Sequence, residues 1–221
     1  MAIFDPFYKD KLELGDVCCE EQPQRPREPK VHAVPALLTP APDWSGVAVV
    51  DSKIHNISLK DYKGKYLILF FYPYDFTFIC PTEMIQFNDR IEEFHKLGCK
   101  IVAISTDSQF SHLAWVITPR KQGGLGNMDI AILSDKNHKI SKMYGVLDEE
   151  EGISLKALFI IDENQLIRHI TIHEICSSRS VDETLRILEA CKFVDKYGNT
   201  CPAGPRESLS SVNNEADFFK A

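Results

Sequence analysis

The chain has 221 residues and a formal net charge of −7, with 44% hydrophobic and 26% charged residues. These values are ordinary for a soluble globular protein with one domain and tails, since domains commonly span about 100–200 residues. The acidic balance disfavours nucleic acid or an anionic membrane as a partner, and no apolar run approaches the roughly 20 residues that cross a bilayer.

The start of the chain and its cysteines both favour a cytosolic protein. The first residues, MAIFDPFYKDKLELGD, lack the apolar stretch of a secretory signal, and their acidic side chains disfavour a transit peptide. The seven cysteines have no regular spacing, so they do not indicate a secreted disulfide framework. No CxxC pair occurs, so no metal is expected. Cys99 and Cys191 fit plain packing.

Three regions are expected along the chain. Residues 1–33 are predicted to form a flexible extension, because prolines lie among charged residues in its second half. Cys18 and Cys19 lie in this extension, and either exposed thiols on a mobile arm or a redox role fits them. Residues 34–200 are predicted to form the folded domain, and residues 201–221 a C-terminal segment and tail.

Within the folded domain, apolar runs alternate with helical patterns. Continuous apolar runs predict buried strands at residues 66–72 and 100–105 and a strand pair at 157–162 and 166–172. Helical spacing predicts one apolar stripe through Met84, Phe87, Ile91 and Phe94, a helix at 109–116, and another that opens at the capping box Ser180–Glu183. This order predicts an α/β fold with a mixed central sheet flanked by helices.

The segment FYPYDFTFICPTE, residues 71–83, is the strongest candidate site. Pro73 ends a buried strand, and a helix is expected to begin at Cys80, because the proline after it is well tolerated in a first turn. A helix N-terminus stabilises a thiolate and lowers its pKa, and an accessible thiolate can attack a peroxide and become a sulfenic acid. Thr77 is close enough in sequence to contact the sulfur or a peroxide oxygen. Spacing alone also allows a buried structural cysteine.

The pattern PxxxTxxC, formed by Pro73, Thr77 and Cys80, resembles the active-site signature of the peroxiredoxins, and FTFICPTE resembles their typical two-cysteine subfamily. Other similar segments are APDW, ISLKDYKGKY, STDSQFSHLAW, TPRKQGGLG, KALFIID and RSVDETLR. The resemblance implies a thioredoxin-like fold with a C-terminal extension. It also implies a thiol peroxidase for hydrogen peroxide and alkyl hydroperoxides, with thioredoxin as reductant and no metal or organic cofactor.

The later segment YGNTCPAG resembles the family's resolving-cysteine motif. The resemblance implies that Cys201 condenses with the sulfenic acid of Cys80 to form a disulfide. In this subfamily the disulfide joins two subunits, which implies a homodimer and allows a ring-shaped decamer. An unreactive tail cysteine is the alternative.

By the family's roles, Glu83 orients the cationic side chains near Cys80, and Arg179 is one of these cations. The other position departs from the family, which has arginine before LFIID where this chain has Lys156. Lysine keeps the positive charge but loses the planar fork that can hold two partners at once.

These departures leave a second function open. Lys156, together with Pro205 where the family commonly has tryptophan, also fits a holdase or redox-signalling protein that keeps the fold and turns over poorly. A thioredoxin-like disulfide reductase is disfavoured, because Glu83 rather than a cysteine lies three residues after Cys80. A cysteine hydrolase would need a positioned histidine base, and no motif supplies one.

Overall fold

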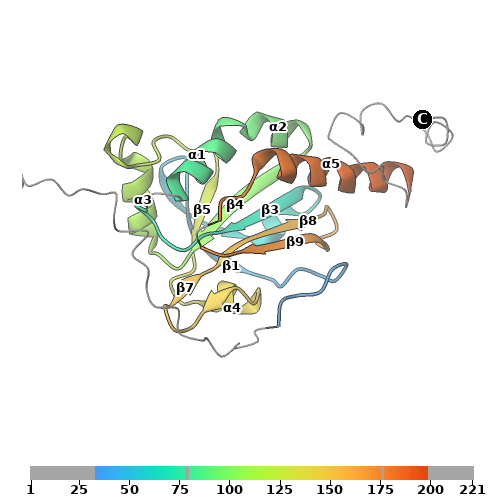
Figure 1. The fold of residues 1–221 in the computed structure, drawn as a ribbon, viewed down its shortest axis with the longest axis horizontal. Helices are drawn as coiled ribbons and strands as arrows, with labels where there is room; N and C mark the ends of the chain where they lie inside the picture. Colours follow the sequence, from blue (N-terminus) through green and yellow to red (C-terminus); the bar gives the residue numbers. More distant parts are fainter. Residues whose placement is uncertain (1–32, 78–79, 176, 199–221) are drawn as a thin grey trace, which may run out of the picture. The chain divides into compact units, whose positions relative to one another are not determined.

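The structure is a computed structural model that describes residues 33–77, 80–175 and 177–198. A seven-stranded sheet with the order β2-β1-β5-β4-β3-β8-β9 forms its centre (Figure 1). The strands are β1 (Ser45–Val50), β2 (Lys53–Ser58), β3 (Tyr66–Phe71), β4 (Cys99–Ser105), β5 (Ala131–Ser134), β8 (Lys156–Ile161) and β9 (Ile167–His173). β3, β4 and β5 run parallel, and the other neighbours are antiparallel. The predicted mixed sheet is therefore confirmed.

Helices cover both faces of this sheet (Figure 1). One face carries α1 (Cys80–Asp89), α2 (Ile91–Lys96), α3 (Gln109–Ile117) and α5 (Val181–Tyr197). The other face carries the short α4 (Lys139–Met143), with the small hairpin of β6 (Leu147–Asp148) and β7 (Ile153–Ser154) nearby. Two 3₁₀ turns, Leu59–Tyr62 and Arg120–Gln122, complete the described elements. None of the helices in this part of the chain is both long and apolar enough to cross a bilayer.

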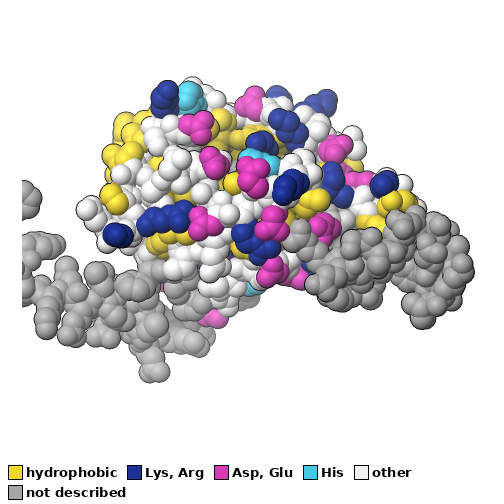
Figure 2. Space-filling view, turned by 90° about the horizontal axis from the view of Figure 1, so that it is seen from above, with side chains coloured by type: hydrophobic (Ala, Val, Ile, Leu, Met, Phe, Trp, Pro, Cys, Tyr) yellow, Lys and Arg dark blue, Asp and Glu magenta, His cyan; other side chains and the backbone are white. Residues whose placement is uncertain are grey.

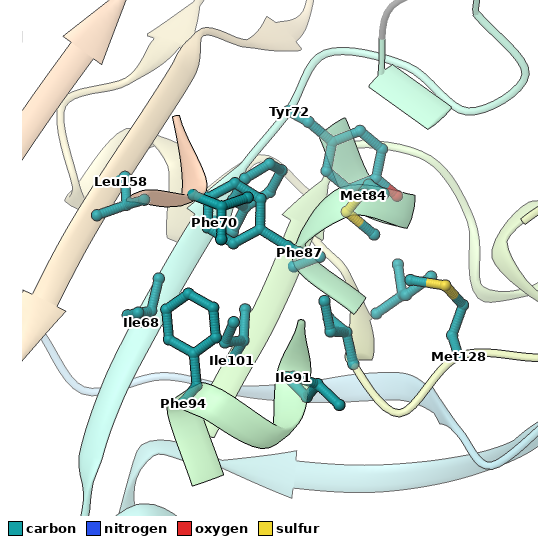
Figure 3. Packing of buried hydrophobic residues seen from close by; sticks show 14 of the residues in the cluster. Ile68, Phe70, Tyr72, Met84, Phe87, Ile91, Phe94, Ile101, Met128 and Leu158 are labelled. Atoms are coloured by element: carbon teal, nitrogen blue, oxygen red, sulfur yellow. The ribbon is translucent and has the colours of Figure 1, made fainter. Parts of the chain in front are cut away.

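β3 is buried on both faces because its side chains alternate between two apolar clusters. Ile68 and Phe70 point toward α1 and α2, where they meet Phe87 and Phe94 (Figure 3). The rings of Phe87 and Phe94 stack at 5.8 Å between centroids, and that of Phe70 meets Phe87 edge-on at 5.0 Å. Full burial of such side chains contributes roughly 1.5–3 kcal/mol each, so this packing fixes the end of β3 that leads to Cys80.

The predicted elements are present with two differences. The apolar stripe from Met84 to Phe94 is carried by two helices, because Arg90 between them has non-helical dihedral angles (φ −109°, ψ 18°). The predicted start of α5 is confirmed, since Ser180 Oγ accepts a hydrogen bond from Glu183 N at 3.3 Å. Three strands of the central sheet were missed, and so were the two-residue strands β6 and β7. β1 and β2 form a hairpin, and β2 is mostly exposed. β5 has only four residues. Neither β2 nor β5 therefore shows a clear alternation of apolar and polar residues.

Candidate active site

Cys80 is the first residue of α1, just after the loop that follows β3, as the sequence predicts. The preceding Pro73 is buried at the end of β3. The side chain of Cys80 is only 3% exposed and belongs to the apolar cluster between the sheet, α1 and α3. The expectation of an accessible thiol is therefore wrong for this closed site, because the apolar residues of the core enclose the sulfur.

The ionisation of Cys80 is decided by opposing effects. Burial raises the pKa of the thiol above its ordinary value, while a hydrogen bond with Thr77 and the positive charge of Lys156 lower it. The predicted net lowering of the pKa at a helix N-terminus is therefore wrong here, since removal of the thiolate from water outweighs the favourable contacts. The positive charge of Lys156 and the hydroxyl of Thr77 limit the rise.

Thr77 lies against the sulfur, as expected. Its hydroxyl is hydrogen-bonded with Cys80 and also lies 3.4 Å from the backbone oxygen of Tyr74, to which it can donate. The loop before α1 therefore presents one hydroxyl group directly to the sulfur of Cys80.

Glu83, one turn after Cys80, is a buried carboxylate between two buried cations. Its Oε2 lies 2.9 Å from Lys156 Nζ, and its Oε1 lies 3.2 Å from Arg179 Nε. Oε1 also accepts the backbone N–H of Arg179 at 2.7 Å. The side chains of all three residues are no more than 2% exposed. The carboxylate thus fixes both cations beside the first turn of α1.

The two cations have different further partners. Arg179 Nη1 donates to the backbone oxygens of Phe71 and Ala157 at 2.7 and 2.9 Å, and its guanidinium lies over the ring of Phe70. Lys156 Nζ donates to the backbone oxygen of Ser177 at 3.2 Å. Lys156 therefore ties the connection between β9 and α5 to Glu83, in addition to acting on Cys80 through its charge.

The structure brings most of the predicted site residues together: Thr77, Cys80, Glu83, Lys156 and Arg179. Cys201 lies outside the described residues, as do Cys18, Cys19 and Pro205. Cys99 is fully buried, and burial raises the pKa of its thiol, while Cys191 is half-buried on α5. Within the ranges that the structure describes, no three His, Cys, Asp or Glu side chains gather closely enough to hold a metal ion.

One feature near the site was missed by the sequence analysis. The carboxylate of Asp75 lies 2.8 Å from His112 Nδ1, and both side chains are buried. The two residues are 37 positions apart and form no motif by spacing. Their pairing depends on how α3 packs, which no local pattern indicates.

Comparison with known proteins gives concordant matches. Residues 38–170 match the profile of the AhpC/TSA family. The chain is 58% identical over 185 residues to peroxiredoxin prdx-2 of Caenorhabditis elegans, covering 82% of this chain and 92% of that protein. It is 55% identical over 172 residues to the mitochondrial thioredoxin-dependent peroxide reductase of Bos taurus, covering 78% of this chain and 66% of that protein. Its structure resembles reduced 2-Cys peroxiredoxin of Plasmodium vivax with a TM-score of 0.77 and 36% sequence identity. The match covers 84% of this chain and 98% of the Plasmodium chain.

The buried carboxylate makes a pH-dependent contribution to stability. Burial raises the pKa of Glu83, but the charge of Arg179 and the hydrogen bonds from Arg179 and Lys156 more than offset it, so this pKa lies below its ordinary value of 4.5. The stabilisation is therefore fully present above about pH 4.5 and is lost as the pH falls through the lowered pKa. We expect Glu83→Gln to lower the free energy of unfolding at pH 7 by about 3–5 kcal/mol, because two cations stay buried without their carboxylate.

Urea unfolding at a series of pH values between 3 and 7 measures this effect. The difference between the wild type and Glu83→Gln should shrink below pH 4.5. Glu92→Gln is a suitable control, because that side chain is 79% exposed, and it should change stability by less than about 0.5 kcal/mol. A difference that stays constant over the whole pH range would contradict the role of the ionised carboxylate.

Proposed function

Because the chain belongs to the AhpC/TSA family and is a thiol peroxidase of the two-cysteine peroxiredoxin type, we propose that Cys80 is the residue that attacks the peroxide. The charge of the buried site carries this proposal. Lys156 and Arg179 bring two positive charges and Glu83 brings one negative charge, all shielded from solvent. One positive charge remains in excess beside Cys80, and ionisation of the thiol balances it.

The reaction follows from this arrangement. The thiolate of Cys80 attacks one peroxide oxygen, so an S–O bond forms while the O–O bond breaks. The leaving oxygen takes up a proton and departs as water or an alcohol. The sulfur is oxidised to a sulfenic acid, and the peroxide is reduced. The hydroxyl of Thr77 and the cations support the negative charge that develops on the oxygens.

We propose that Cys201 then resolves the sulfenic acid. Its thiol attacks the sulfur of Cys80, an S–S bond forms, and water leaves. Because Cys80 is buried, the first turn of α1 must open before the sulfur meets another thiol. The opening separates Glu83 from its cations, so it competes with the network that closes the site. Thioredoxin is proposed as the reductant that restores both thiols, by analogy with the bovine thioredoxin-dependent peroxide reductase.

One equivalent of hydrogen peroxide, added to the reduced protein, should produce a disulfide-linked dimer on a non-reducing gel. Cys80→Ser and Cys201→Ser should each remove this band, because each supplies one sulfur of the bond. Cys99→Ser and Cys191→Ser are matched controls that should keep it. A dimer that persists in both Cys80→Ser and Cys201→Ser, for instance through Cys18 or Cys19, would show that the assignment is wrong.

A second function, that of a holdase or signalling protein with slow turnover, is favoured by one observation. Lys156 Nζ is held by Glu83 and by the backbone oxygen of Ser177, so it has less freedom than an arginine fork to align a peroxide. Peroxide turnover with thioredoxin and thioredoxin reductase distinguishes the two functions, since only a peroxidase sustains it.

One substitution of Lys156 should raise the rate of Cys80 oxidation, and another should lower it. Lys156→Arg adds donors for the sulfur and a peroxide oxygen, so we expect about a tenfold faster reaction, or about 1.4 kcal/mol. Lys156→Met removes the charge and should slow the reaction at neutral pH by at least about tenfold. Stopped-flow measurement under pseudo-first-order peroxide gives both values. An unchanged or slower rate in Lys156→Arg would mean that the pocket is adapted to lysine.

We further propose that homodimers assemble into a ring through an apolar surface at α3. Four large side chains are exposed there, on the loop after β3 and on α3: Tyr74, Phe76, Phe110 and Ile117. Figure 2 shows hydrophobic side chains gathered at the end of the molecule where α3 lies, while charges of both signs are interspersed elsewhere on this view. A contiguous apolar surface of this kind indicates a protein partner, and a second copy of the chain fits the family.

Phe110→Glu should dissociate the ring into dimers, because a carboxylate would be buried in the apolar contact. Analytical ultracentrifugation of the reduced protein measures the mass. Met143→Glu introduces the same charge on α4, at another exposed apolar residue on the opposite face of the sheet (42% exposed, against 66% for Phe110), and should leave the mass unchanged. The proposal for the α3 surface fails if Phe110→Glu has the mass of the wild type, or if both variants dissociate.

A further inference from the structure

The loop between β3 and Cys80 contains a buried carboxylate with several donors around it. The side chain of Asp75 is 2% exposed. Its Oδ1 accepts a hydrogen bond from the hydroxyl of Tyr72 at 2.8 Å, and its Oδ2 accepts one from Ser111 Oγ at 2.7 Å. Oδ2 also lies 2.8 Å from His112 Nδ1. Ser111 and His112 belong to α3, so this carboxylate attaches the loop to that helix.

The backbone of Asp75 is attached to the same region. Its N–H donates to Asp107 Oδ2 at 2.8 Å, in the connection between β4 and α3. Asp107 is held in turn by Ser105, whose hydroxyl lies 3.3 Å from the same oxygen. Both the side chain and the main chain of Asp75 are therefore fixed to β4, α3 and the connection between them.

The next residue shows that this attachment determines the path of the loop. Phe76 has a φ of +54°, a left-handed conformation that is unfavourable for a residue with a side chain. Such a conformation persists when surrounding contacts impose it. The anchor at Asp75 lies on one side of Phe76, and the ring of Phe76 packs on Trp115 of α3 at 6.0 Å between centroids. The turn imposed in this way leads directly to Thr77.

We propose that Asp75 is a positioning residue of the peroxidase site. It fixes the loop to α3, so that the hydroxyl of Thr77 lies against the sulfur of Cys80. A displacement of about 1 Å in an active site can cost about 100-fold in rate, because the reacting groups must be aligned before attack. This inference rests on the proposed role of Cys80, and it adds a residue that contacts neither the sulfur nor the peroxide.

Asp75→Asn tests the proposal with little change in shape. The amide cannot accept hydrogen bonds at both ends, so either the contact to Tyr72 or the contacts to Ser111 and His112 must rearrange. We expect oxidation of Cys80 by hydrogen peroxide to be about tenfold slower, as followed by stopped-flow tryptophan fluorescence. Trp115, beside Phe76, supplies a probe within the site.

Asp135→Asn is the matched control. Asp135 is also a buried carboxylate, and it accepts hydrogen bonds from the backbone N–H groups of Ile140 and Ser141 at 2.9 and 2.7 Å. These residues belong to α4, on the face of the sheet opposite to α1. Asp135→Asn should lower stability to urea and leave the oxidation rate of the folded protein unchanged. If Asp75→Asn behaves in the same way, its role is only structural and the proposal is overturned.

A double-mutant cycle with Thr77→Val shows whether Asp75 acts through Thr77. The effect of Asp75→Asn should fall from about tenfold to less than about twofold in the Thr77→Val background, because the hydroxyl to be positioned is gone. Independent, multiplicative effects of the two substitutions would overturn the proposed route. If Asp75→Asn does not fold, Ser111→Ala removes one donor from the same carboxylate and should slow oxidation about two- to threefold.

Cys80→Ser separates failure of this inference from failure of the proposed function. If the oxidation signal persists in Cys80→Ser, the proposed function of Cys80 is wrong. If Cys80→Ser abolishes the signal while Asp75→Asn and Ser111→Ala leave the rate at its wild-type value, the function stands and only the positioning role of Asp75 is wrong.

Discussion

The buried carboxylate of Glu83 joins three elements that are distant in the sequence. It lies on the first turn of α1, while Lys156 begins β8 and Arg179 precedes α5. Removing one partner from a buried ion pair leaves an uncompensated charge that costs about 3–5 kcal/mol. The first turn of α1, the start of β8 and the approach to α5 therefore hold their positions together, and the environment of Cys80 depends on all three.

The same ion network acts on the thiol. One carboxylate cannot neutralise two cations, so the remaining positive charge favours ionisation of Cys80, while burial opposes it. In the closed site burial has the larger effect on the pKa of the thiol. In the proposed reaction, the positive charge of Lys156 therefore supports the thiolate of Cys80 against the effect of burial. Both cations are held by backbone oxygens as well as by Glu83, which limits their movement.

Local sequence patterns indicate the strands that are buried on both faces and the start of a helix at Cys80, because apolar runs and a proline in the first turn carry that information without tertiary context. The resemblance to a family supplies the further side chains around the sulfur. The contact of Lys156 with the backbone oxygen of Ser177 could not be predicted, since it depends on the path of a loop. The pairing of Asp75 with His112 was missed for the same reason, and the burial of the thiol emerges only when α1 and α3 pack together.

The enclosure of the Cys80 sulfur also makes its access depend on the size of the reactant. Hydrogen peroxide is close to water in its dimensions and needs little space to reach Cys80, whereas a thiol on a peptide or protein is far too large to enter a site that leaves 3% of the residue exposed. An enclosed site protects a reactive intermediate from side reactions. In the proposed reaction, the small oxidant reacts while the fold is closed, and the bulky thiol reaches the sulfur only after α1 opens. The second half-reaction already requires the sulfenic acid made in the first, and molecular dimensions add an opening of the fold to that requirement.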